Sequence, residues 1–244
     1  MKVASKVVFL FKDPDGLATA IADSLHPHPN SSLRSLTDGS NVNFLSGNER
    51  LLQKSFWQLV PVSLVSEISL QYQVSVLLLE MYEPPILACA LNEVLTQFFG
   101  ESGLPTLVVP FVFESSKLKL ENKTLTTNGG NVTLYGVQIG QETDRTRAIA
   151  ASTKKAPSSL QIHHEPLACF LQLARVLKLS VSVVIGYGGQ SFSANTFEKE
   201  LEVIYEIGEL LANTSSLCFL REKIKWNPVK TSRETKEPWR ALYG

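Results

Sequence analysis

Two carboxylates near the start of the chain have the type and spacing of an acidic active site. Asp13 and Asp15 follow the apolar run Val7–Phe11, and ligands of α/β proteins often bind beyond the carboxyl ends of such strands. The same residues also fit a turn and a helix cap, because short carboxylates accept hydrogen bonds from backbone amides there. We favour the turn and cap, and keep the acidic active site as an alternative.

The stretch from Gly186 to Gln190 has the composition of a phosphate-binding turn. It follows a predicted strand, where glycines let backbone amides approach an anion. A dinucleotide-binding fingerprint needs a third glycine at the start of a helix, whereas Ser191, Phe192 and Ser193 precede the next helix cap. The sequence favours a structural turn and leaves open whether this turn binds a ligand.

The histidines give no clear metal or catalytic site. His163, His164 and Glu165 are adjacent, and adjacent residues cannot share one face of a helix or strand, so we interpret them as the solvated start of a helix. No serine or cysteine lies in a nucleophile-elbow pattern such as Gly-x-Ser-x-Gly. We therefore predict no catalytic residue, no metal site, no cofactor, and a protein that is not an enzyme.

Composition narrows the class of protein. The 244 residues are 44% hydrophobic, enough for an ordered body that forms one domain. The 23 basic and 23 acidic residues cancel, which makes nucleic acid a poor partner. The first apolar run is too short for a secretory signal, and no stretch reaches the roughly 20 apolar residues of a membrane span. Cys89, Cys169 and Cys218 are far apart and are predicted to be buried thiols in a reducing compartment.

Strands and helices alternate along the chain. Apolar runs predict buried strands at Val7–Phe11, Val74–Leu79, Leu104–Phe113 and Val181–Ile185. Spacing and caps predict helices over Leu17–Leu25, from Pro166 to Leu177, and from a cap at Asn195 to Leu211. Another helix is predicted to end at Gly100, and its apolar face consists of Leu87, Leu91, Val94, Leu95 and Phe98. In the last helix the glutamates are predicted to face water: Glu198, Glu202, Glu206 and Glu209.

Other segments are less regular. We predict loops over Asn30–Asn43 and Thr143–Gln161, a short strand at Val42–Leu45, strands or edges within Phe56–Tyr72, and a hairpin turn at Asn128–Asn131. Pro105 and Pro110 indicate an edge position or an irregular end for the strand that contains them. The fold class is therefore α/β, a mixed and mostly parallel sheet flanked by helices, with one domain over 1–220 and an extended, flexible C-terminal docking tail over 221–244.

The tail ends in three residues with distinct binding chemistry. Leu242 offers an aliphatic side chain, Tyr243 a ring with a directed hydroxyl, and Gly244 a terminal carboxylate. Together they can occupy one narrow pocket, with the carboxylate paired to a lysine.

Leu242-Tyr243-Gly244 matches the hydrophobic-tyrosine-any motif of proteins that dock between α subunits of the 20S proteasome. The order of elements from Val7 to Leu220 also resembles the proteasome assembly chaperone 1 family, although the acidic N-terminal extension of some members is absent. The resemblance implies a chaperone without enzymatic activity that pairs with a related chaperone 2 subunit and promotes α-ring formation. It also implies that the tripeptide inserts into an α-subunit pocket, and that the protein acts in the cytoplasm and also in the nucleus.

Two other functions fit the same sequence. An α/β enzyme of nucleoside phosphorylase-like or hydrolase-like type would use Asp13, Asp15 and the Gly186–Gln190 turn, but this rests on fold analogy alone. A generic peptide-binding or scaffold module would have its tail read by some other carboxylate-binding domain. Convergent polar groups with perturbed pKa values in a pocket would favour the enzyme.

Overall fold

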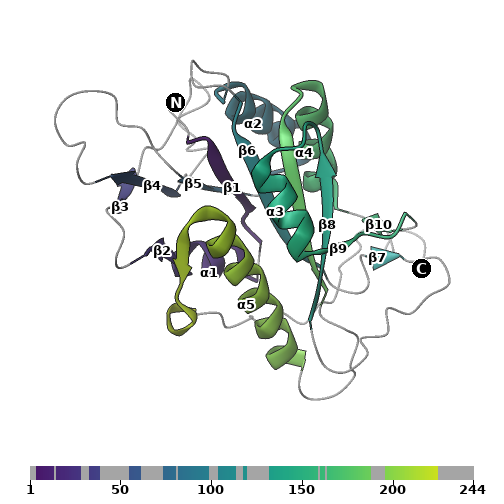
Figure 1. Cartoon of the computed structure of the whole chain (residues 1–244). Helices are drawn as coiled ribbons and strands as arrows, with labels where there is room; N and C mark the ends of the chain where they lie inside the picture. The colour runs from purple at the N-terminus through teal and green to yellow at the C-terminus, as the bar shows by residue number, and fades with distance from the viewer. Residues whose placement is uncertain are drawn as a thin grey trace, which may run out of the picture.

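The structure is a computed structural model, shown in Figure 1. It describes residues 4–13, 15–28, 33–38, 55–61, 74–80, 82–98, 104–113, 118–119, 132–158, 160–162, 164–187 and 196–224. Among them, none of the helices combines the length and the apolar composition that spanning a bilayer would require.

The described residues contain one large sheet and two small ones. The large sheet has the strand order β3-β4-β5-β1-β6-β11-β8-β9. Its strands are β1 (Lys6–Phe11), β3 (Leu33–Asp38), β4 (Ser55–Pro61), β5 (Val74–Leu79), β6 (Thr106–Phe113), β8 (Thr133–Ile139), β9 (Lys154–Lys155) and β11 (Ser180–Tyr187). The small antiparallel pairs are β7 (Leu118–Lys119) with β10 (Gln161–Ile162), and β2 (Leu25–Pro27) with β12 (Leu217–Phe219).

The helices flank the large sheet (Figure 1). They are α1 (Leu17–Ser24), α2 (Pro84–Thr96), α3 (Asp144–Ser152), α4 (Glu165–Val176) and α5 (Thr196–Ser215), with a short 3-10 helix, η3 (Arg221–Lys223). The four central strands β5, β1, β6 and β11 are mutually parallel, whereas β4 and β8 run antiparallel to their neighbours β5 and β11. The predicted α/β class with a mixed sheet is confirmed.

Alternating side chains of the central strands build a core on each face of the sheet. In β1, Val7, Phe9 and Phe11 point to the face covered by α2 and α4, while Val8 and Leu10 point to the face covered by α1, α3 and α5. This period of two is the geometry of a strand. All five side chains are buried, as expected of a parallel strand covered on both faces.

The predicted apolar face of the second helix is confirmed. Its five members are all buried against the core, where burial of apolar area drives packing: Leu87, Leu91, Val94, Leu95 and Phe98. Pro166 occupies the first turn of α4, as predicted. In α5, the predicted inward residues Ile204, Ile207 and Leu211 are buried, and the glutamates lie on the opposite face.

Two segments predicted to be loops contain regular structure. The prediction of a loop over Thr143–Gln161 is wrong, because α3 and β9 lie within it. Thr143 and Thr146 form a reciprocal capping box at the start of α3, which satisfies backbone amides that would otherwise lack partners. The loop predicted over Asn30–Asn43 is also wrong in part, since it contains β3, which pairs with β4.

The predicted edge position of the proline-containing strand is wrong. β6 lies between β1 and β11. Its ladder with β1 runs only from Thr106 to Val108, so Pro110 lies beyond the last paired residue on that side. An interior strand can therefore carry a proline at this position without losing a ladder hydrogen bond to β1.

The cysteines are less buried than predicted. Cys89 is exposed on the outer face of α2, and Cys169 and Cys218 are half-buried; all three are free thiols. The prediction failed because apolar neighbours in sequence do not fix which way a residue of a helix or strand points. The predicted strand at Val42–Leu45 and the hairpin turn at Asn128–Asn131 lie outside the described residues.

Candidate functional site

The carboxyl ends of the parallel strands are the first place to look for a binding site. Strand β1 leads to α1 on one face of the sheet, and its neighbour β5 leads to α2 on the other. Ligands of α/β proteins bind where adjacent strands diverge in this way. We call the polar side chains found here the carboxyl rim: Lys12, Asp13, Asp15, Glu80 and Tyr82.

Lys12 and Glu80 pair with each other across the carboxyl rim. Lys12 Nζ lies 2.5 Å from Glu80 Oε1, and the Lys12 amide donates to the carbonyl of Leu79 at 2.8 Å. Both side chains are half-exposed, so the ion pair is weak in free energy. It nevertheless connects the ends of β1 and β5 through their side chains.

Asp13 caps the first helix. Its two carboxylate oxygens accept hydrogen bonds from the amides of Leu17 at 3.0 Å and Ala18 at 2.8 Å. Gly16 makes the turn with φ +76°, a conformation that is costly for other residues. The interpretation of Asp13 as a cap is confirmed, and the amides that could bind an anion at the start of α1 are already occupied. Asp15 lies half-buried in the same turn.

Tyr82 completes the carboxyl rim beside Glu80. Partial burial raises the pKa of its hydroxyl above the ordinary value of 10, and the negative charge of Glu80 adds to this effect. A raised pKa means that the phenol stays protonated at neutral pH. It is therefore a hydrogen-bond donor rather than a general base.

Aromatic rings pack against one another beside the carboxyl rim. Phe11 meets Phe170 edge-on at 5.9 Å between ring centroids and lies 5.6 Å from Phe111. His164 packs against Phe111 at 5.0 Å, and its Nδ1 accepts the amide of Leu167 at the start of α4. The position of His164 at a helix start is as predicted, and no three His, Cys, Asp or Glu side chains of the described residues gather into a metal-binding group.

Gly186 is a packing residue rather than part of a turn. It lies within β11, and an added Cβ would come within 2.4 Å of Val203 and 2.9 Å of Ile207 on α5. Only glycine lets the helix approach the strand so closely. The rest of the predicted turn, Gly188 to Gln190, lies outside the described residues.

A second polar cluster lies at the opposite end of the sheet and was not foreseen from the sequence. Arg145 on α3 is 8% exposed. Its Nη1 donates to the carbonyls of Val7 at 3.2 Å and Thr106 at 3.0 Å, and its Nη2 donates to Ser215 Oγ at 2.5 Å. We call Thr106, Arg145 and Ser215 the amino rim.

The charge of Arg145 is balanced by dipoles. The described residues place no carboxylate against it, and its Nε has no hydrogen-bond partner among them. Burial lowers the pKa of Arg145 to about 10, which leaves the guanidinium protonated at neutral pH. Ser215 is the last residue of α5, so the negative end of that helix faces the cation.

The strand before the predicted docking tail and the first four residues of that tail are fixed to the body. We call Leu217–Ile224 the tail root. Its strand β12 pairs with β2, and the Leu220 amide donates to the carbonyl of Ser24 at 2.9 Å. Lys223 Nζ lies 3.1 Å from His26 Nε2, and partial burial together with Lys223 lowers the pKa of His26. The docking residues themselves, Leu242, Tyr243 and Gly244, lie outside the described residues.

The family follows from a match over the full sequence. A family model described as "Domain of unknown function (DUF7894)" matches residues 1–244. The chain belongs to the DUF7894 family. No curated protein matches this DUF7894 chain.

Solved structures share the fold of the DUF7894 chain at low sequence identity. Pyrococcus furiosus PbaA, described as an archaeal homolog of proteasome-assembly chaperone, is 11% identical with a TM-score of 0.52, over 100% of this chain and 89% of that one. PbaB of the same organism, described as an archaeal proteasome activator, is 8% identical with a TM-score of 0.51, over 100% and 96%. A Thermoplasma acidophilum protein of unknown function is 12% identical with a TM-score of 0.50, over 99% and 90%. At these identities the likeness shows a shared fold.

Proposed function

We propose that this chain is a chaperone for 20S proteasome assembly that works by binding other proteins and not by catalysis. The observation that carries the proposal is the likeness of fold to PbaA and PbaB, which extends over the whole of this chain and at least 89% of theirs. Fold alone does not fix function, so the chemistry of the carboxyl rim and of the tail has to agree with it.

The carboxyl rim supports a binding protein over an enzyme. Its lysine, its glutamate and its first aspartate are engaged by one another or by the start of α1. A catalytic site instead needs polar groups that converge on a space for substrate. Here the ring of Phe11, next to Lys12, packs against the rings of Phe111 and Phe170 in the core.

The tripeptide Leu242-Tyr243-Gly244 is the proposed docking segment. It inserts into a pocket between proteasome α subunits, where the leucine and tyrosine bury apolar area and the Gly244 carboxylate pairs with a lysine. Three residues bind weakly by themselves, so the body must make a second contact that raises their effective concentration. That contact comes from a heterodimer with a chaperone 2-type subunit, which promotes α-ring formation in the cytoplasm and the nucleus.

Co-purification with 20S particles or α-ring intermediates tests this function. The chain, with an unmodified C-terminus and expressed with its candidate partner, is compared with Tyr243→Ala and with a deletion of 242–244. Trp239→Ala is the matched control, because it removes an aromatic ring from the tail but leaves the tripeptide intact. We expect wild type and Trp239→Ala to associate, and the other two to lose most of the association.

Two outcomes would contradict the proposal at different levels. If no form associates with α subunits even with the partner present, the assembly function is wrong. If all four forms associate equally, the body docks but the tripeptide has no part in docking.

A further inference from the structure

The outer face of α5 is a continuous acidic stripe. Glu198, Glu202, Glu206 and Glu209 recur at intervals of four, four and three residues, which puts them on one side of a helix. The first three are exposed and Glu209 is half-exposed. In the part of the chain that the structure describes, Glu209 has an ion-pair partner and the other three have none.

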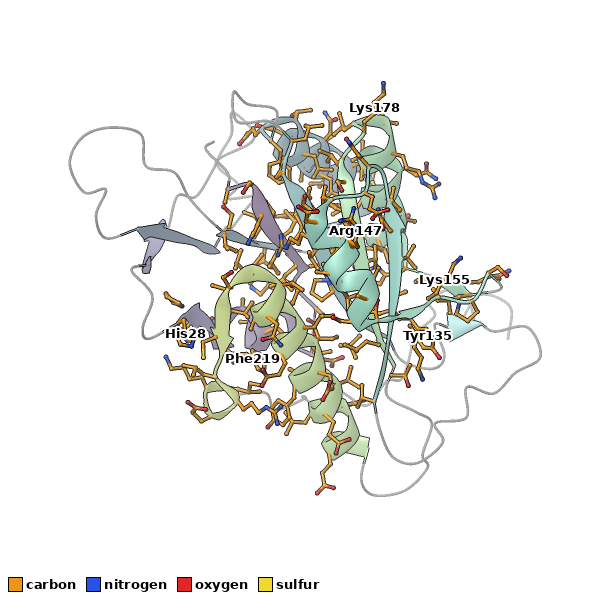
Figure 2. The ribbon with its side chains drawn as sticks, in the orientation of Figure 1. His28, Tyr135, Arg147, Lys155, Lys178 and Phe219 are labelled. Carbon is orange, nitrogen blue, oxygen red and sulfur yellow. The ribbon has the colours of Figure 1, made fainter. Side chains whose placement is uncertain are left out.

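The chain that follows α5 turns back along this helix. Ser216, with φ +60°, begins the reversal. Phe219 then lies beside α5 (Figure 2). Its ring packs on Gly208, where an added Cβ would clash with it. Arg221 follows, with its guanidinium 4.9 Å from the centre of the Tyr205 ring. Phe219 and Arg221 thus lie beside α5, while Lys223 lies beside His26 of β2.

Arg221 already binds the acidic stripe. Its Nε donates to Glu209 Oε1 at 3.2 Å while its guanidinium lies over Tyr205. An arginine stacked on a ring and paired with a carboxylate is a recognised mode of cation binding. The first basic residue after β12 is therefore held by the stripe, and three further glutamates continue beyond it.

The next segment of the chain has the complementary charge. Residues 225–236 contain Lys225, Lys230, Arg233 and Lys236 against one acid, Glu234, a net charge of +3. The segment α5 contains five glutamates and one lysine, a net charge of −4. The span from Glu209 to Glu198 is about 16 Å at 1.5 Å per residue. Twelve extended residues reach about 40 Å, so the segment is long enough to cover it.

We propose that the acidic stripe of α5 is the docking surface for the chain's own basic segment 225–236. Beyond the contact of Arg221 with Glu209, the lysines and the arginine of this segment pair with Glu206, Glu202 and Glu198. The docking tripeptide is thereby carried toward the start of α5, near the carboxyl ends of the strands. This deepens the proposed function, because an α-ring surface would have to compete with the stripe for the tail.

The other helical layer lacks this complementarity. The outward residues of α2 include one charge, Glu93, and those of α4 include Glu165 and Arg175. The outer faces of α2 and α4 therefore carry too little negative charge to attract a basic segment. The acidic stripe is therefore the favoured surface, and α2 and α4 supply matched positions for a control.

Zero-length carbodiimide cross-linking of the isolated chain, followed by peptide mass spectrometry, tests the docking. The reagent joins a lysine amine to a carboxylate only when the two are in contact. At about 0.01 M salt we expect links from Lys225, Lys230 or Lys236 to Glu198, Glu202 or Glu206 within monomers. Their yield should fall roughly five-fold near 1 M salt, where the screening length drops from about 30 Å to about 3 Å.

Matched variants separate docking from general charge effects. Glu202→Gln/Glu206→Gln should remove most links to the stripe, whereas Glu93→Gln/Glu165→Gln, with the same loss of charge on the other layer, should leave them unchanged. The swap Glu202→Lys/Glu206→Lys combined with Lys230→Glu/Lys236→Glu should restore the links in reversed polarity, which a folding defect would not do.

Several results would overturn the proposal. These are an absence of tail-to-stripe links, links spread equally over Glu93 and Glu165, and links found only between two chains, which would assign the stripe to a second copy. Because no proteasome is present, the result is independent of the proposed function. Links without proteasome association would refute the assembly role and keep the docking, and the reverse result would refute the docking alone.

Discussion

The amino rim and the carboxyl rim lie at opposite ends of the same strands and use charge in opposite ways. At the amino rim, one buried cation is held by two backbone carbonyls and a hydroxyl. At the carboxyl rim, the charged groups are half-exposed, and Lys12 pairs with Glu80 while Asp13 caps α1. The carboxyl ends of the strands, where α/β proteins usually bind ligands, thus have the weaker charge interactions.

This difference shows where a charge contributes most to stability. A buried hydrogen-bonded charge leaves its partners unsatisfied when it is removed, whereas exposed ion pairs are screened by water and salt. Arg145 connects three elements that are far apart in the sequence: β1, β6 and α5. We therefore expect the largest effects at the amino rim and progressively smaller ones at the carboxyl rim.

The largest effect is expected for Arg145→Met. The change keeps most of the side-chain volume but leaves two carbonyls and the Ser215 hydroxyl without their donor, at a cost of about 3 kcal/mol. Urea denaturation measures the free energy of unfolding. Arg147→Met is the control, since Arg147 is exposed and makes only surface ion pairs with Glu142 and Asp144. Equal stability of the two variants would show that the guanidinium does not hold the amino rim together.

Asp13→Ala should cost about 1 kcal/mol of unfolding free energy. The variant loses both hydrogen bonds to the first amides of α1, and the loss of a capping side chain is typically of this size. Asp13→Asn keeps one acceptor and should fall between wild type and Asp13→Ala in the same denaturation experiment. A destabilisation as large as that of Arg145→Met would remove the contrast between the two rims.

The pair of Lys12 and Glu80 should couple by less than about 1 kcal/mol. A double-mutant cycle of Lys12→Met and Glu80→Gln isolates this energy from the other effects of each change. The coupling should shrink further as salt is added. The side chains of Lys12 and Glu80 are 42% and 28% exposed. A coupling that is large and independent of salt would mean that they are more buried than this in solution.

The smallest effect concerns the titration of Tyr82. Its raised pKa means that its contribution to stability is present below the unfolded-state pKa of 10 and is lost as the pH rises through the higher folded-state pKa. Glu80→Gln removes the nearby negative charge and should lower the pKa of Tyr82. Phenolate absorbance of each protein, with its Tyr82→Phe counterpart subtracted, measures this shift. If Glu80→Gln does not change the pKa of Tyr82, burial alone raises that pKa.

Local patterns in the sequence predicted most of the framework. The central strands and α2 were predictable because long apolar runs and a repeated helical spacing report burial directly. Helix α3 was missed because its inward residues are Arg145, Thr146 and Ile149, a polar set without apolar periodicity. The reciprocal threonines at 143 and 146 were the available signal for its start.

The site was less predictable than the fold. The role of Asp13 could be inferred because its partners lie four and five residues away. The role of Arg145 could not, because its partners Val7, Thr106 and Ser215 are distant in sequence and an arginine pattern normally indicates a solvated face. The docking role of Leu242-Tyr243-Gly244 stays a prediction, since these residues lie outside the described part of the chain.

The position of β1 also constrains how the protein is made. β1 precedes both of its neighbours in the sheet, β5 and β6, which begin at Val74 and Thr106. During translation the apolar segment Val7–Phe11 must therefore wait for both of them before it is paired on its two sides. Late, long-range pairing slows folding, and exposed apolar strands favour aggregation. A chain proposed to assist assembly thus exposes an apolar strand of its own while it is being made.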